Sequence, residues 1–163
     1  MSQQTTNNRR AEIKYRSEMV LREIMSQEEV ASQQSVLLKM LQERIDGTKR
    51  DIRALKEKGV RTAPFIELGA ERCQRSLALC DGLASNGYAT DISLDMLRSA
   101  EHYSTVLNLP QMPVRVCCDA YRLPFRSGSV PFVFCYQTLH HFPAPKMIAD
   151  EAHRVLAPGG SLF

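Results

Sequence analysis

Apolar and polar residues follow two different patterns along the chain, and the change falls near residue 62. Before it, apolar side chains recur every three or four positions, as on one face of a helix. After it, short apolar runs alternate with helical stretches. The pattern predicts a helical N-terminal extension, residues 1–61, followed by a mixed α/β core, residues 62–163, with the boundary at Arg61–Pro64.

The extension is expected to contain several helices. Residues 9–26 and 28–46 show helical spacing, and Asp46–Thr48 is expected to interrupt the second helix. Thr48 with Asp51 resembles a capping box, which predicts the start of a last short helix that ends at Gly59 as a C-terminal cap. Apolar positions with alternating spacings of three and four are Leu38, Leu41, Ile45, Ile52 and Leu55. A short coiled-coil seam, and hence a dimer through these helices, would produce this spacing. A helix packed on its own domain explains it better, because fewer than three clean heptads are present.

The core alternates strands with helices. Strands are expected at 65–68, 88–91, 114–118, 130–136 and 161–163, and helices at 72–85, 94–106 and 146–156. This order predicts a Rossmann-like, doubly wound and mainly parallel sheet with helices on both faces. Since the strand segments are mostly apolar rather than alternating, we expect them to be buried on both faces. The fifth strand would only begin at Ser161, so the expectation is a core truncated at strand five, either part of a longer protein or an inactive form.

Composition and charge argue against nucleic-acid binding, membrane insertion and secretion. The 163 residues carry a net charge of +3, all of it on residues 1–60, with 12 basic and 9 acidic side chains, so no clustered basic face for nucleic acid is expected. No apolar run approaches the roughly 18 residues that span a bilayer, and the polar first ten residues are not a signal peptide. Five cysteines without a C-x-x-C pair indicate buried, reduced thiols in a cytoplasmic protein, and no metal site is expected.

Polar residues follow the predicted strands at their carboxyl ends, where ligands bind in such sheets. In chain order they are Glu67, Gly69 and Glu71, then Asp91, then Asp119, then the segment Tyr136–His141. The sequence strand, tight turn, helix, strand and acid is typical of a site for an adenosine-containing cofactor.

Each residue type has a chemical reason to stand at its position. Gly69 lets the backbone pass close to a ligand. Asp91, 22 residues further on, can accept both hydroxyls of a ribose, and Asp119 can accept a hydrogen bond from a purine amino group. Any one of these acids could equally well be a solvent-facing loop residue. That interpretation explains poorly why acids stand at three successive strand ends.

Five segments together resemble a known family. They are F-I-E-L-G-A-E-R-C, A-T-D-I-S-L-D-M-L, C-C-D-A-Y-R-L-P-F, V-P-F-V-F-C-Y-Q-T-L-H-H-F and E-A-H-R-V-L-A-P-G-G-S-L-F. Residues 64–163 are similar to the class I S-adenosylmethionine-dependent methyltransferases, in the group that includes the ubiquinone-biosynthesis-type enzymes. The resemblance implies S-adenosylmethionine as cofactor and an unidentified, small-molecule methyl acceptor. It implies cofactor contacts at Glu67, Gly69, Ala70, Glu71, Asp91, Ile92, Asp119, Ala120 and Tyr136.

Three residues depart from the family pattern. Glu71 and Cys73 stand where the family has its second and third glycines, and Pro131 replaces an aspartate before the fourth strand. The Glu71 side chain could crowd the cofactor, contact its ammonium group or repel its carboxylate. It also argues against the rival interpretation, a dinucleotide dehydrogenase, because a negative charge would stand where a pyrophosphate must bind.

No catalytic residue is identified from the sequence. His140 or His141 could act as a general base, although packing under the cofactor loop and capping of a turn explain them better, and His102 and His153 are expected on the surface. Methyl transfer from a sulfonium depends mainly on proximity and alignment. The alternative hypothesis is a degenerate, non-catalytic methyltransferase-like fold with a helical protein-interaction segment.

Overall fold

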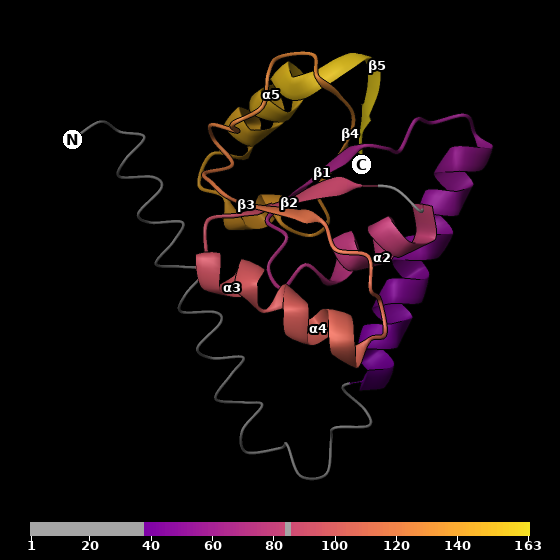
Figure 1. Ribbon diagram of the computed structural model, residues 1–163. Coiled ribbons are helices and arrows are strands. Elements are labelled where there is room, and N and C mark those ends of the chain that lie inside the picture. Colours follow the sequence, from indigo (N-terminus) through magenta and orange to yellow (C-terminus); the bar gives the residue numbers. More distant parts are fainter. Residues whose placement is uncertain (1–37, 84–85) are drawn as a thin grey trace.

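A computed structural model of the protein describes residues 38–83 and 86–163 (Figure 1). It confirms the predicted fold class, a parallel sheet flanked by helices. The strands are β1 (Phe65–Leu68), β2 (Gly87–Asp91), β3 (Val114–Cys117), β4 (Val130–Phe134) and β5 (Leu156–Leu162). The helices are α2 (Gln74–Leu83), α3 (Leu94–Arg98), α4 (Ala100–Val106) and α5 (Pro145–Val155), with a 3-10 turn η1 (Leu139–His141). The helix predicted at residues 9–26 lies outside the described residues.

The sheet has the strand order β3-β2-β1-β4-β5, and each pair of neighbours is parallel. The chain therefore moves outward from β1 through β2 to β3, and then crosses to the other side of β1 to form β4 and β5. The switch point of the sheet therefore lies between β1 and β4, and ligands of such sheets bind beyond the carboxyl ends of the strands at this point.

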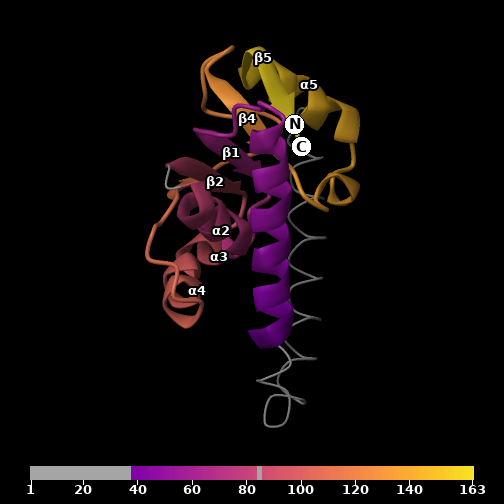
Figure 2. The same ribbon diagram turned by 90° about the vertical axis from the view of Figure 1, so that its right-hand side faces the viewer.

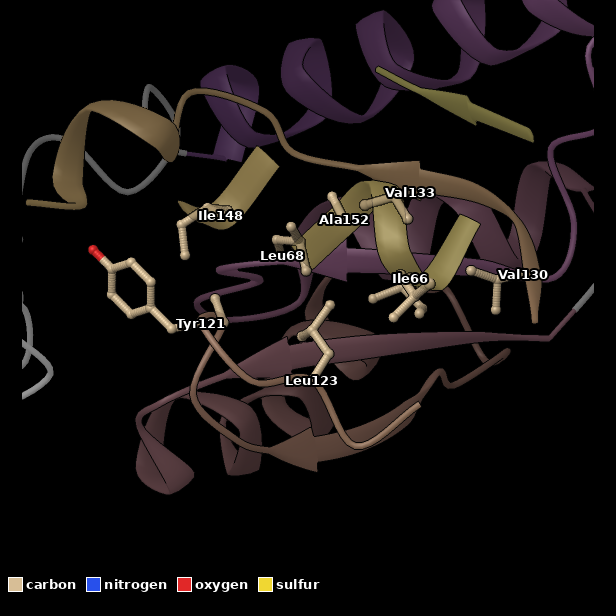
Figure 3. Packing of buried hydrophobic residues seen from close by; sticks show 10 residues of the cluster. Ile66, Leu68, Tyr121, Leu123, Val130, Val133, Ile148 and Ala152 are labelled. Carbon is tan, nitrogen blue, oxygen red and sulfur yellow. The ribbon is translucent and has the colours of Figure 1, made fainter. Parts of the chain in front are cut away.

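Apolar side chains cover both faces of the central strands. On one face, Phe65 of β1 and Phe132 of β4 pack with Leu79 of α2. On the other, Ile66 and Leu68 pack against α5, whose residues Ile148 and Ala152 point toward them in the cluster that Figure 3 shows. All four residues of β1, F-I-E-L, are buried because its side chains alternate between two covered faces, and this explains why the strand is mostly apolar, as predicted for a strand buried on both sides.

The helix before the sheet is continuous from residue 38 to residue 57, so the predicted interruption at Asp46–Thr48 is wrong. The hydroxyl of Thr48 donates to the carbonyl of Arg44 within the helix, at 2.9 Å, instead of capping a new one. Ile45 and Ile52 are buried against α2 and the sheet, which stabilises the helix through the expected break. The predicted end at Gly59 is confirmed by its φ of +80°.

Figure 2 shows this helix lying alongside α2. Lys49 pairs with Asp81 of α2 at 2.6 Å, which adds a polar link to the buried contacts of Ile45 and Ile52. The apolar spacing thus reflects packing on the chain's own core, as the sequence favoured. The division into residues 1–61 and 62–163 stays a prediction.

Strand β5 begins at Leu156, five residues before the expected start at Ser161. The sequence pattern predicts Leu156 at the end of a helix and the strand only from Ser161. The chain instead forms an irregular ladder, in which Leu156 pairs with Val130 and Ser161 pairs with Phe132. Pro131 falls within this shifted interval, where a regular ladder donor is not needed.

Two further expectations differ from the structure at the edge of the sheet and along one helix. Strand β3 lies at the edge and is largely exposed, with Val114 at 53%, so burial on both faces was wrong for it. Cys117, the last residue of this strand, is also exposed, whereas Cys73 and Cys80 are buried free thiols as expected. The helix predicted over 94–106 is divided at Ser99 into α3 and α4.

Candidate functional site

The turn between β1 and α2 has the backbone shape of a glycine-rich loop although it contains one glycine. Gly69, Glu71 and Cys73 have φ angles of +63°, +48° and +58°. These are the three positions at which the resemblance implied glycine. A left-handed conformation costs a non-glycine residue about 1–2 kcal/mol, so the surrounding contacts must hold the turn in this shape.

Hydrogen bonds and burial supply those contacts. The backbone N–H of Glu71 donates to Oδ2 of Asp91 at 2.8 Å, and that of Ala70 donates to the carbonyl of Thr90 at 2.9 Å. Cys73 is fully buried, and its N–H donates to the carbonyl of Ala70 at 2.7 Å. The turn is therefore fixed to the end of β2 by its own backbone.

Gly69 is required for a second reason besides its φ angle. A Cβ atom at this position would lie 2.2 Å from Cγ2 of Thr138, in the loop that follows β4. The loops after β1 and β4 thus approach each other closely at the switch point of the sheet. This contact separates two pockets that share Gly69, Glu71, Thr138 and His141 in their walls.

The first pocket, called the apolar pocket below, contains about 610 Å³ of empty space that is partly open to solvent. It extends from the β1 turn along the ends of β2 and β3. Besides the shared residues, its walls are formed by Thr90, Asp91, Ile92, Cys118, Asp119, Ala120, Tyr121 and Phe142.

Asp91 is the central acid of the apolar pocket. Its Oδ1 accepts from the N–H of Ser93 at 2.8 Å, and its Oδ2 accepts from the N–H of Glu71 at the same distance. Burial raises the pKa of this carboxyl, while these two backbone donors act in the opposite direction. The donors fix the carboxylate plane, and each oxygen keeps a lone pair that can accept a ligand hydroxyl.

Asp119 and Ala120 stand at the far end of the apolar pocket. Oδ1 of Asp119 accepts from the N–H of Tyr121 at 3.0 Å, which shapes the turn after β3. The hydroxyl of Tyr121 in turn accepts from the N–H of Ala144 at 3.0 Å, before α5. The loop that carries Asp119 is thereby linked to the segment around Phe142 that closes the pocket.

The second pocket, called the polar pocket below, lies between the β1 turn, the loop after β4 and the helix 38–57. Besides the shared residues, its walls are formed by Arg44, Glu67, Ala70, Arg72, Gln74, Arg75, Tyr136, Gln137 and His140. All nine residues that the resemblance implied therefore line one pocket or the other. Gly69, Glu71, Asp91, Ile92, Asp119 and Ala120 line the apolar pocket, and Glu67, Ala70 and Tyr136 line the polar one.

Glu67 differs from the other acids in its burial. It is 4% exposed, and its carboxyl accepts a hydrogen bond from the hydroxyl of Ser76 on α2. Burial raises its pKa to about 8, against the opposing influence of Ser76 and Arg75. The group is therefore a neutral acid near pH 7, and it joins the end of β1 to the first turns of α2.

Several pocket residues were missed because they do not stand at strand ends. Arg75 lies on α2, with its guanidinium carbon 3.5 Å from the ring centre of Tyr136, and it donates to Oγ1 of Thr48 at 2.9 Å. Arg44 comes from the helix before the sheet. Arg44 reaches the pocket only through the tertiary packing of that helix, and Arg75 lies in the first turn of α2 beyond the strand end, so a search of strand ends finds neither residue.

The histidine pair lies in η1, with ring centres 3.9 Å apart. Both rings line the polar pocket, and His141 reaches the apolar pocket as well. Their position leaves both interpretations in place, that of a base and that of packing and capping residues. His102 and His153 are exposed, which confirms that part of the prediction.

Comparison with known proteins agrees with this geometry. A model of a family described as a methyltransferase domain matches residues 66–163, and the chain belongs to that family. The sheet order and flanking helices are those of a class I S-adenosylmethionine-dependent methyltransferase.

Individual relatives cover parts of the chain. A chloroplastic protein of Arabidopsis thaliana, described as an uncharacterized methyltransferase, is 43% identical over 75 residues, which is 44% of this chain and 21% of that protein. A putative S-adenosyl-L-methionine-dependent methyltransferase from Methanococcus maripaludis is similar in structure, with a TM-score of 0.65 and 19% identity over 77% of this chain and 57% of that one. The protein PH0226 from Pyrococcus horikoshii has a TM-score of 0.61 and 24% identity over 74% and 52%. The chain thus spans about a fifth of the curated relative and about half of these solved chains.

Proposed function

We propose that the protein binds S-adenosylmethionine and transfers its methyl group to a small-molecule acceptor. The observation that carries this proposal is Asp91, a buried carboxylate fixed by two backbone donors beside an open apolar pocket. When bound, the cofactor supplies an activated methyl group on a sulfonium.

The residues present suit this cofactor. Asp91 would accept the ribose hydroxyls, Asp119 would accept from the adenine amino group, and Ile92 and Ala120 would flank the base. The left-handed turn at Gly69 would pass beneath the amino-acid end, next to Tyr136. The polar pocket adjoins this end, so it is the natural site for the acceptor.

Calorimetric titration with S-adenosylhomocysteine tests the proposal. We expect binding by the wild-type chain, and a loss of about tenfold or more in Asp91→Ala, because two hydroxyl acceptors are removed. Asp95→Ala is the matched control, since Asp95 lies four residues away on α3, is 88% exposed and lines neither pocket. Absence of binding in the wild type, or equal affinity in Asp91→Ala, would contradict the proposal.

A non-catalytic methyltransferase-like protein is the second candidate, favoured by Glu71 and Cys73 in place of glycines. It predicts no affinity for S-adenosylhomocysteine despite an intact fold. A dimer through the N-terminal helices is proposed with it. Leu41, Ile45 and Ile52 are buried within the chain, so such a dimer would use other positions, for example Leu38 and Met40, which are exposed. Sedimentation of the whole chain measures the oligomeric state.

Cellular location stays a prediction. In the described part of the chain, no helix has the length and apolar character to cross a bilayer. We propose a cytoplasmic protein, as the free cysteines suggested, and the Arabidopsis relative is described as chloroplastic. Fractionation of cells that express the protein would distinguish the two compartments.

A further inference from the structure

Three arginines line the polar pocket, but the guanidinium of Arg72 donates to the hydroxyl of Tyr103 on α4, which is not part of the pocket wall. Arg44 comes from the helix 38–57, Arg72 precedes α2, and Arg75 lies in the first turn of α2. Among the described residues, no carboxylate forms an ion pair with Arg44 or Arg75. Arg44 donates to the neutral amide of Gln74 at 3.1 Å. Within residues 38–83 and 86–163, neither of these two positive charges is therefore neutralised by direct contact with a carboxylate.

The pKa values of Arg75 and Glu67 are consistent with an excess of positive charge in the pocket. The pKa of Arg75 is lowered by burial and next by the charge of Arg44, so the two guanidinium groups repel each other. Glu67 does little to offset the repulsion between the two guanidinium groups, because burial raises its pKa to about 8 and leaves the carboxyl neutral near pH 7. The first turn of α2 contains no acidic residue, and the N–H groups at its start add partial positive charge. Glu71 at the rim is the remaining carboxylate in the pocket wall.

S-adenosylmethionine does not balance this charge. Its sulfonium and ammonium are positive and its carboxylate is negative, so the molecule is a net cation. The guanidinium groups of Arg44 and Arg75 outnumber the Glu71 carboxyl in the pocket wall, so the pocket is positive before the cofactor binds and more positive afterwards. The filled site therefore favours a second, anionic molecule.

We infer that the polar pocket binds the acidic group of the methyl acceptor, a small molecule carrying a carboxylate or phosphate held between Arg44 and Arg75. This inference rests on the proposed function and adds the acceptor's class to it. In the transfer, a lone pair of the acceptor forms the new bond to the methyl carbon. The carbon–sulfur bond breaks with its electron pair left on sulfur, and a protonated acceptor atom releases its proton to solvent. The sulfonium charge disappears in this step.

The two arginines are held differently, and this suits a binding site. Arg75 is fixed on both sides, by the ring of Tyr136 at 3.5 Å and by Oγ1 of Thr48 at 2.9 Å. Its fork is thus oriented before a ligand arrives, which reduces the entropy lost on binding. Arg44 is exposed on its helix and can adjust to the size of the anion.

The test uses the whole chain, with succinate and inorganic phosphate as probes in calorimetric titrations. Each probe is added to the free protein, to the protein saturated with S-adenosylhomocysteine, and to the protein saturated with 5′-methylthioadenosine, which lacks the amino-acid carboxylate. The variants are Arg44→Gln and Arg44→Lys, with Arg75→Lys as a second site. Arg98→Gln is the control, because Arg98 is exposed on α3 and lines neither pocket. Thermal unfolding checks that each variant is folded.

We expect at least one probe to bind both nucleoside complexes with similar affinity. Arg44→Gln should weaken this binding by about tenfold or more, Arg44→Lys should weaken it less, and Arg98→Gln should leave it unchanged. Binding to the methylthioadenosine complex alone would overturn the inference, because the arginines would then hold the cofactor's own carboxylate. Absence of anion binding, or equal binding by Arg44→Gln, would also overturn it.

The same titrations distinguish a failure of the proposed function from a failure of the anion site. If neither nucleoside binds to the wild-type chain, the methyltransferase proposal is wrong, and the free protein alone decides whether an anion site exists. Anion binding that Arg44→Gln weakens would then support the anion site, and anion binding that it leaves unchanged would overturn it.

Discussion

Substitution of Gly69 by alanine tests how the switch point of the sheet is built. The new side chain would have to adopt a φ of +63°, and its Cβ would lie 2.2 Å from Cγ2 of Thr138. The two effects are separable, because the first belongs to the β1 turn alone whereas the second needs the loop after β4. Gly128 provides a matched control, because it has a φ of +65° and a Cβ added there would meet nothing within 4 Å.

The expected magnitudes follow from this separation. Gly128→Ala should lower the free energy of unfolding by about 1–2 kcal/mol, the cost of a left-handed alanine. Gly69→Ala should lower it by about 2–5 kcal/mol, because overpacking adds about 1–3 kcal/mol. Thr138→Ser removes Cγ2 but keeps the hydroxyl, which donates to the carbonyl of Tyr136 at 3.0 Å. In the Gly69→Ala background this change should restore about 1–2 kcal/mol.

Urea unfolding of the wild type, the two single variants, the double variant and Gly128→Ala measures these differences. The reasoning predicts a favourable coupling between positions 69 and 138 in the double-mutant cycle. Strictly additive effects would refute the steric contact. A loss in Gly69→Ala no larger than that in Gly128→Ala would show that the backbone angle alone matters.

Two other perturbations examine the buried acid and the first helix. The pKa of Glu67 is about 8 in the folded state and near 4.5 in the unfolded state. Folding therefore takes up a proton between these pH values, and the free energy of unfolding falls as pH rises from about 4.5 to about 8. Glu67→Gln should remove this pH dependence, which urea unfolding of the wild type and the variant at about pH 5 and pH 8 measures. The same loss of unfolding free energy between the two pH values in both proteins would refute the idea. Ile52→Ala, at a residue 2% exposed, should lower the free energy of unfolding by about 2–5 kcal/mol. Met40→Ala, at a residue 61% exposed, should change it by less than about 0.5 kcal/mol, and similar losses in the two variants would mean that the helix is not anchored by this face.

The strand-end residues could be predicted because their positions follow from local pattern and topology. A parallel sheet brings the ends of β1, β2 and β3 to one edge, so Gly69, Asp91 and Asp119 were placed there from the sequence alone. The family resemblance added Ile92 and Ala120, which lie beside those acids.

The polar pocket could not be predicted in the same way. Arg44 reaches it because Ile45 and Ile52 are buried against the core, a tertiary contact that local periodicity does not locate. Thr48 was assigned to a helix start because its type favours caps. Its hydroxyl is instead used inside the helix and by Arg75, and the energy of burial outweighed the local preference.

The two missing glycines bear on whether the site has decayed. Left-handed angles at Glu71 and Cys73 together cost about 2–4 kcal/mol, a large part of the roughly 5–15 kcal/mol that stabilises a typical domain. A turn without other constraints would relax to a different shape. The N–H of Glu71 is held by Asp91, and Cys73 is buried with Ala89 and Leu97, so the fold itself imposes the strained shape. Loss of glycine therefore does not imply loss of the turn, and the change that remains at Glu71 is the side chain and charge that it brings to the walls of both pockets.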